Sequence, residues 1–166
     1  MKEITEKEKF KELFENIASE EKWNQNSLNK ILRKFKKNDG QLYRNDELVK
    51  MFVIVKKDFS KKNISLIEKR IRLKPTRTNS GVSVVTVMMM PYYCPGNCIF
   101  CPNDRSMPKS YIASEPGSQR ASKMKFDPYA QVFNRLIALK NVGHNIEKVE
   151  LIVLGGTFSA YSGEYK

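Results

Sequence analysis

Residues 82–101, with the sequence VSVVTVMMMPYYCPGNCIFC, combine a strand-like segment with a cluster of cysteines. Residues 82–90 are rich in β-branched side chains and lie between a turn signal and a proline, which predicts a buried strand. The residues that follow place Cys94, Cys98 and Cys101 in the pattern C-x3-C-x2-C. Functional loops of α/β proteins follow the carboxyl ends of strands, so this stretch indicates both a fold class and a site.

The downstream sequence predicts one βαβ unit. A loop from Tyr92 to about Phe126 leads to Asp127-Pro128, where aspartate is a typical N-cap and proline suits the first helical turn. An amphipathic helix is expected there, and residues 149–154 (VELIVL) predict a second buried strand closed by Gly155-Gly156. Strand, cysteine loop, helix and strand in this order predict the α/β class with a parallel sheet.

The region before the first strand is strongly basic. The chain has 166 residues and a net charge of +12. Residues 30–77 hold 16 Lys and Arg against five Asp and Glu, a net of +11. Apolar spacing predicts helices near residues 5–21, 27–37, 46–57 and 61–71. Clustered positive charge favours a polyanion bound through its phosphates, although a merely solvated helical face remains the alternative.

Composition excludes several classes of protein. Apolar residues make up 40% of the chain and charged residues 29%, too apolar for a fully disordered chain and too polar for a membrane protein. The N-terminal residues, MKEITEKEKF, are charged and have no apolar core, unlike a signal peptide. We therefore expect a cytoplasmic protein that does not contact the membrane.

The cysteine spacing predicts a metal centre. Three thiols on one short loop suit an iron–sulfur cluster, whose usual ligands are thiolates. Gly96 lets the loop fold tightly. Three protein ligands leave one iron of a four-iron cluster open for chemistry, by analogy with open zinc sites. Two alternatives stay open: a structural zinc site with His144 as fourth ligand, and thiols that bind nothing.

The spacing resembles the signature of the radical S-adenosylmethionine superfamily. The resemblance implies a 4Fe-4S cluster held by the three cysteines, with S-adenosylmethionine chelated by the open iron and cleaved to a 5′-deoxyadenosyl radical. Phe100, before the third cysteine, is then expected beside the adenine. Gly155, Gly156 and Thr157, after the second strand, are expected to line the same cofactor site.

A closer resemblance, to the catalytic subunits of the elongator complex, runs from about Leu73 to Phe158. It implies modification of the tRNA wobble uridine at C5 to a carboxymethyl-type product, with acetyl-CoA supplying the two-carbon unit. The matching residues are Lys74-Pro75, Arg77-Thr78, Ser80-Gly81-Val82, Pro91-Tyr92, Cys94-Pro95, Ser110-Tyr111, Glu115-Pro116, Arg120-Ala121, Asp127-Pro128-Tyr129, Gln131, Arg135, Gly143-His144, Lys148-Val149-Glu150 and Gly155-Gly156-Thr157-Phe158.

The resemblance implies two regions. Residues 1–77 would be a basic helical tRNA-binding region, and residues 78–166 the start of an incomplete radical S-adenosylmethionine partial barrel of the (βα)6 type. The acetyltransferase domain of the family is absent, so we expect a fragment whose partners are tRNA, the rest of the barrel and other elongator-type subunits. Candidate RNA contacts are Arg77, Lys109, Arg120 and Lys123.

Two other functions remain open at this point. The chain could be a catalytically inactive basic tRNA-binding module, or a radical S-adenosylmethionine enzyme that acts on a different class of substrate. The release of 5′-deoxyadenosine distinguishes an enzyme from an inactive tRNA-binding module. The dependence of this release on tRNA and acetyl-CoA distinguishes the uridine-modifying enzyme from one that acts on a different substrate.

Overall fold

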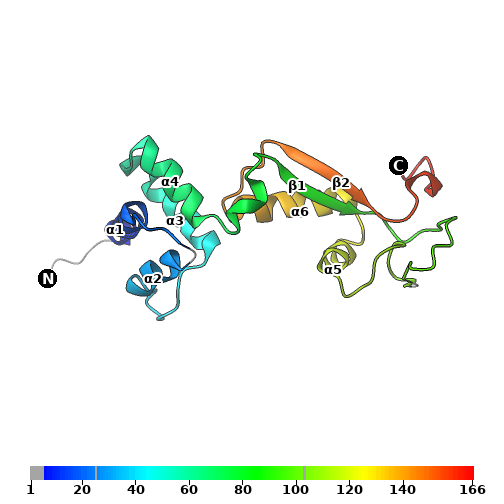
Figure 1. The fold of residues 1–166 in the computed structure, drawn as a ribbon, viewed down its shortest axis with the longest axis horizontal. Coiled ribbons are helices and arrows are strands. Elements are labelled where there is room, and N and C mark those ends of the chain that lie inside the picture. The colour runs from blue at the N-terminus through cyan, green and yellow to red at the C-terminus, as the bar shows by residue number, and fades with distance from the viewer. Residues whose placement is uncertain (1–5, 25, 103) are drawn as a thin grey trace. The chain divides into compact units, whose positions relative to one another are not determined.

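A computed structural model describes residues 6–24, 26–102 and 104–166 (Figure 1). The chain divides into two compact units. The helical unit comprises the residues up to Gly81 together with Leu139–Asn145, and the sheet unit comprises Val82–Ala138 and Ile146–Lys166. In the described parts of the chain, no helix is both long and apolar enough to cross a membrane.

Four α-helices form most of the helical unit, close to the predicted ranges. They are α1 (Glu6–Ser19), α2 (Ser27–Lys34), α3 (Asn45–Val55) and α4 (Lys61–Ile71), followed by a 3-10 turn at Pro75–Thr78. Residue 5, where the first helix was expected to start, lies outside the described residues. The predicted helix ends at residues 21, 37 and 57 were too late, because each helix stops two or three residues earlier.

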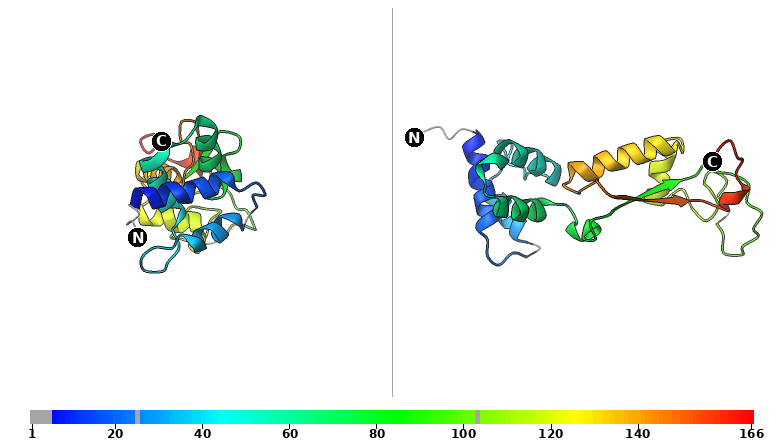
Figure 2. Two further views of the ribbon diagram at one scale, coloured as in Figure 1. Left: turned by 90° about the vertical axis from the view of Figure 1, so that its left-hand side faces the viewer. Right: turned by 90° about the horizontal axis from the view of Figure 1, so that it is seen from above.

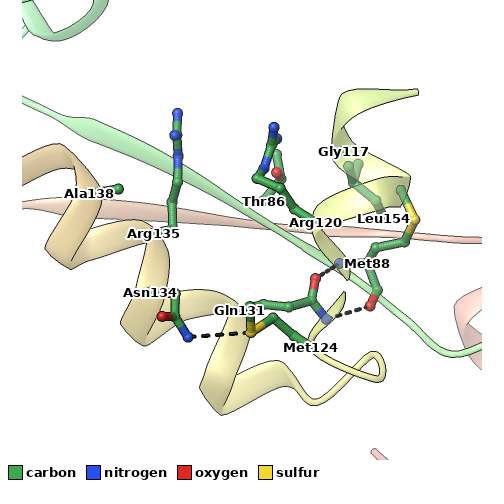
Figure 3. A pocket seen from close by; sticks show the side chains of 10 residues that line it. All are labelled: Thr86, Met88, Gly117, Arg120, Met124, Gln131, Asn134, Arg135, Ala138 and Leu154. Carbon is green, nitrogen blue, oxygen red and sulfur yellow. Dashed lines mark hydrogen bonds between the residues drawn. The ribbon is translucent and has the colours of Figure 1, made fainter. Parts of the chain in front are cut away.

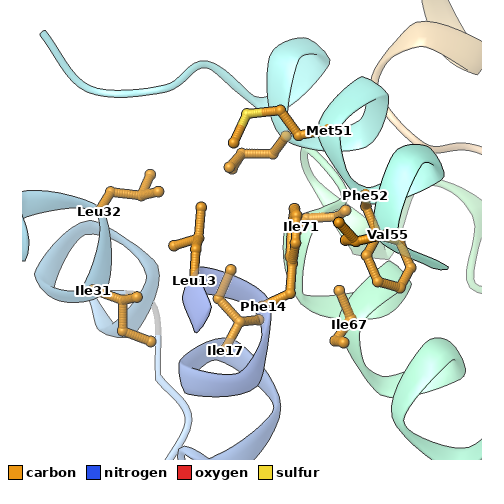
Figure 4. Close-up of a cluster of buried hydrophobic side chains, with 11 residues drawn as sticks. Leu13, Phe14, Ile17, Ile31, Leu32, Met51, Phe52, Val55, Ile67 and Ile71 are labelled. Carbon is orange, nitrogen blue, oxygen red and sulfur yellow. The ribbon is translucent and has the colours of Figure 1, made fainter. Parts of the chain in front are cut away.

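The apolar faces of these helices meet in one core (Figure 4). The rings of Phe14 from α1 and Phe52 from α3 lie 4.9 Å apart, and the side chain of Phe14 is fully buried. The helical unit therefore has a hydrophobic core of its own. The residues of this core are Leu13, Phe14, Ile17, Ile31, Leu32, Leu48, Met51, Phe52, Val55, Ile67 and Ile71.

Removing the Phe14 ring is expected to destabilise the helical unit strongly. Phe14→Ala deletes a fully buried aromatic ring and leaves a cavity, so the free energy of unfolding should fall by about 3–5 kcal/mol. Chemical denaturation followed by circular dichroism measures this change. The control is Val53→Ala, because Val53 lies on the same core-forming helix as Phe52 but is 68% exposed. Equal destabilisation by the two variants would contradict the described core.

Several basic residues of this unit stabilise the fold. The Arg70 guanidinium lies over the Trp23 ring at 4.6 Å and donates to the backbone carbonyl of Glu20 at 2.9 Å. It also donates to the Ile17 and Ala18 carbonyls, so it satisfies backbone acceptors at the end of α1. Lys37 pairs with Glu47 at 2.6 Å. The most exposed cations remain available to a polyanion; they include Arg33, Lys34, Lys36, Lys57, Lys61, Lys62 and Lys69.

The sheet unit contains the predicted parallel strands. β1 (Ser83–Met88) pairs with β2 (Val149–Leu154), from Ser83 opposite Val149 to Met88 opposite Leu154. β1 is shorter than the predicted 82–90. Together with the helix between them, the strands form the expected βαβ unit and agree with the α/β class. The right-hand view of Figure 2 shows the two strands side by side.

Two helices lie between the strands, where the sequence predicted one. α6 (Pro128–Asn141) starts as expected, with the Asp127 carboxylate accepting a hydrogen bond from the Ala130 amide at 2.6 Å. The second helix, α5 (Pro116–Lys123), lies within the segment 92–126 that was predicted to be an unbroken loop. That prediction was wrong, because Pro116 occupies the first turn of α5.

The two strands differ in burial. Alternate residues of β1 are buried, among them Ser83, Val85 and Val87. In contrast, β2 stays largely exposed, with Leu151 at 54% and Val153 at 47%. The prediction that β2 is a buried strand is therefore wrong for the described structure, since the chain places too little apolar surface over it.

Candidate functional site

The end of β1 is held by side chains from distant segments. The Gln131 amide donates to the Met88 carbonyl and accepts from the Met88 amide, both at 2.9 Å (Figure 3). Two residues later, the Tyr161 hydroxyl donates to the Met90 carbonyl at 2.8 Å, and the Met90 amide donates to the Tyr165 hydroxyl at 3.0 Å. The sheet has two strands in the described part of the chain, and these bonds satisfy backbone groups of β1 and of the residues after it where the chain enters the cysteine loop.

The three cysteines are free thiols with different surroundings. A Cβ at Gly96 would lie 3.7 Å from the Cys94 sulfur and 3.8 Å from the Cys98 sulfur, so these two thiols flank the glycine. The Cys101 amide donates to the Cys98 carbonyl at 3.1 Å, which closes a turn. The Cys101 thiol donates to the carbonyl of the next residue, Pro102, at 3.8 Å.

The donor set suits an iron–sulfur cluster in its chemistry. Three free thiols lie on one loop, and the glycine between two of them leaves space that a side chain would fill. In the described conformation, however, no three His, Cys, Asp or Glu side chains among residues 6–24, 26–102 and 104–166 are grouped so as to hold a metal ion. The structure brings Cys94 and Cys98 around Gly96 but does not bring Cys101 into a common group.

Cys94 contacts the segment that follows β2. Its sulfur lies 3.3 Å from the Thr157 hydroxyl oxygen. The pKa of the Cys94 thiol is lowered, first by the hydrogen bond from the Thr157 side chain, then by backbone amides of Gly96 and Thr157, and also by the charge of Lys109. The loop and the end of β2, 63 residues apart in sequence, are thus joined at one sulfur atom.

The glycines after β2 permit this close approach. A Cβ on Gly156 would lie 3.3 Å from the Lys109 Cβ and 3.4 Å from the Cys94 Cβ. A Cβ on Gly155 would lie 2.6 Å from the Met89 Cε and 3.3 Å from the Met89 Cβ. A side chain at position 156 would therefore press on the cysteine loop at Cys94 and Lys109, whereas one at position 155 would displace the Met89 side chain.

The lowered pKa of Cys94 gives a pH-dependent prediction. Because the thiolate is stabilised, its alkylation by iodoacetamide should reach half its maximal rate at a lower pH than in Thr157→Val. Mass spectrometry of the modified peptide at a series of pH values measures this midpoint. The Thr157→Ser variant keeps a hydroxyl donor and should behave like the wild type, whereas identical midpoints in all three proteins would contradict the contact.

Other predicted site residues lie in varied places. Phe100 is 86% exposed, so it is not part of the core and its predicted cofactor contact stays a prediction. Arg77 is exposed in the Pro75–Thr78 turn, and Arg120 and Lys123 lie on α5. Lys109, predicted to contact RNA, lies beside Gly156 and Cys94.

His144 has a structural partner. It is buried in the helical unit, with its ring Nδ1 2.9 Å from the Thr78 hydroxyl oxygen. No residue of the cysteine loop joins it in a metal-binding group within the described residues. The zinc alternative therefore gains no support from this histidine.

Sequence reasoning missed the residues that support the loop. Gln131 was noticed only as part of the resemblance, and Tyr161 and Tyr165 were not singled out. No local sequence signal identifies them, since each acts on a backbone group far away in the chain. Arg120 and Arg135 both line a pocket beside β1 (Figure 3). They are 15 residues apart in the sequence, which gave no sign that they lie at the same pocket.

Comparison with known proteins finds close relatives for part of the chain. It is 47% identical over 102 residues to "tRNA uridine(34) acetyltransferase" of Methanocaldococcus infernus, a match that covers 58% of this chain and 19% of the relative. It is 43% identical over 108 residues to "Elongator complex protein 3" of Bos taurus, covering 58% of this chain and 20% of that protein. The chain thus spans about a fifth of the length of these relatives. No family model matches it.

Proposed function

We propose, because this chain is a homologue of the catalytic subunit of the elongator complex, that it serves in the modification of uridine in tRNA. The names of the relatives support a tRNA-uridine acetyltransferase as the whole enzyme. The activity, the tRNA substrate and any elongator-type partner or remaining barrel are part of this proposal, since the chain covers only a fifth of the relatives.

The contact between Cys94 and Thr157 carries the proposal. It joins the cysteine loop after β1 to the glycine-containing segment after β2, at the carboxyl ends of two parallel strands. Ligands of open parallel sheets bind at that edge. A radical S-adenosylmethionine site would use these two segments together, in a partial barrel that begins with the βαβ unit.

The chain's own residues have separable roles in this proposal. Cys94, Cys98 and Cys101 would hold a 4Fe-4S cluster, and for this Cys101 would have to leave the Pro102 carbonyl. Gly156 lets the segment after β2 approach Cys94 closely, and S-adenosylmethionine would bind where this segment and the cysteine loop meet. When bound and reduced, the cluster would supply the electron that cleaves S-adenosylmethionine.

The finer reaction follows the family resemblance. The product would be a carboxymethyl-type uridine at the wobble position, with the two-carbon unit coming from acetyl-CoA in a separate acetyltransferase domain. The exposed Phe100 is free to pack on the adenine of the cofactor. Arg77, Arg120 and Lys123 would contact tRNA phosphates, whereas Lys109 lies closer to the cluster cysteine.

Anaerobic reconstitution with iron and sulfide tests the enzymatic proposal. The reconstituted protein should show the absorbance of a four-iron cluster and, after reduction, release 5′-deoxyadenosine from S-adenosylmethionine. Release that increases with tRNA and acetyl-CoA supports the uridine-modifying reaction. Release of 5′-deoxyadenosine that depends on neither tRNA nor acetyl-CoA would indicate a different substrate class. A protein that carries the cluster but releases no 5′-deoxyadenosine would contradict the enzymatic proposal.

The helical unit supports a second candidate, a tRNA-binding module without catalysis. Its eleven-residue core lies within α1 to α4, and its exposed lysines are independent of the cysteine loop. Phosphate attraction needs charge but no cofactor. This candidate predicts tight tRNA binding by protein that takes up no iron.

A further inference from the structure

The Thr157 hydroxyl is aimed at a sulfur that the proposed function assigns to the cluster. The oxygen and the Cys94 sulfur lie 3.3 Å apart, within hydrogen-bond distance for sulfur. In a free thiol either atom can donate. A metal-bound thiolate has no proton, so the hydroxyl of Thr157 must then be the donor.

The backbone permits this close approach of Thr157 to Cys94. Gly156, one residue before, has no Cβ, and a Cβ there would lie 3.5 Å from the same sulfur and 3.4 Å from the Cys94 Cβ. On the loop side, Met90 is fixed by hydrogen bonds to Tyr161 and Tyr165. The chain that leads into the cysteine loop is therefore anchored in the sheet unit four residues before Cys94.

We propose that Thr157 is a positioning residue that donates a hydrogen bond to the Cys94 sulfur of the cluster and thereby raises the cluster's reduction potential. This inference rests on the proposed function, and it assigns Thr157 a partner other than S-adenosylmethionine. Hydrogen bonds to ligating sulfurs withdraw negative charge and stabilise the reduced, more negative cluster. They also orient the ligand, which slows its loss.

The decisive variants are Thr157→Val, which replaces the hydroxyl with a methyl group of similar size, and Thr157→Ser, which keeps the donor. Thr157 is exposed, so the valine should fold as the wild type does. Thr76→Val is the control, because Thr76 is an exposed threonine of the helical unit. Each reconstituted full chain is analysed for iron and sulfide content and titrated spectroelectrochemically.

The expected result is a more negative midpoint potential in Thr157→Val, faster iron loss to a chelator, and wild-type values in Thr157→Ser and Thr76→Val. A loaded Thr157→Val protein with the wild-type potential would overturn the inference while leaving the proposed function intact. If Thr157→Val takes up no iron but Thr157→Ser does, the result supports the role of the hydroxyl. If neither variant takes up iron, the inference is overturned. A wild-type chain that takes up no iron contradicts the proposed function, and the inference with it.

Discussion

Cys98→Ala is expected to abolish assembly of the iron–sulfur cluster and to leave tRNA affinity unchanged. Two thiolates cannot replace three as ligands of a four-iron cluster, and Cys98 flanks Gly96 beside Cys94. The exposed lysines of the basic block and Arg77 lie in the helical unit, and Arg120 and Lys123 lie on α5, so none of these cations belongs to the segment from Cys94 to Cys101. Iron and sulfide analysis after anaerobic reconstitution measures the first effect, and a filter-binding titration with tRNA measures the second.

Ile99→Ala is the matched control for this variant. Ile99 is the next residue, its side chain is 100% exposed, and it carries no metal-binding group, so the alanine variant should load iron like the wild type. A normal iron content in Cys98→Ala would refute the assignment of this thiol as a ligand. A collapse of tRNA affinity in Cys98→Ala would refute the separation of the basic and cysteine-containing parts.

The second large effect is expected when the exposed lysines of α4 are neutralised. A triple glutamine variant of Lys61, Lys62 and Lys69 should bind tRNA much more weakly at low salt. Each phosphate contact that is lost means that one counterion fewer is released from the tRNA on binding. The slope of log affinity against log salt concentration should fall by about 1 for each lysine that contacts a phosphate. Titrations at several salt concentrations measure this slope.

Lys11→Gln together with Lys22→Gln provides the comparison. These lysines are also exposed, but they lie in residues 1–29, where the net charge is −2. The double variant should keep the wild-type slope. If it reduces the slope as much per lysine as the α4 variant does, binding is spread over the surface and the basic block has no special role.

Hydrophobic periodicity predicted most elements of this fold. The strand at residues 149–154 and the helix at residues 61–71 have the expected bounds. Such patterns are local, because an apolar stripe or a β-branched run records which side of an element is buried. The sequence did not predict α5, because the residues of this helix, PGSQRASK, form no apolar stripe. Its proline is the only residue that indicates a helix start.

The basic block shows where charge counting reaches its limit. Counting treats Arg70 and Lys61 alike, yet Arg70 covers Trp23 and binds the Glu20 carbonyl, whereas Lys61 is exposed. Which cations face solvent depends on the packing of helices that are distant in the sequence. The structure therefore reduces the number of cations that can contact a polyanion.

The amino-acid sequence by itself determined the type of unit, a basic helical region before a βαβ segment, and the three thiols that mark its chemistry. Both are properties of neighbouring residues. Only the tertiary structure decided that Thr157 meets Cys94, that Gln131 pairs with the free edge of β1, and that Lys109 lies near the cysteine. These contacts join residues that are far apart in the chain, and their partners are selected by strand register and close backbone approach, which no local pattern encodes.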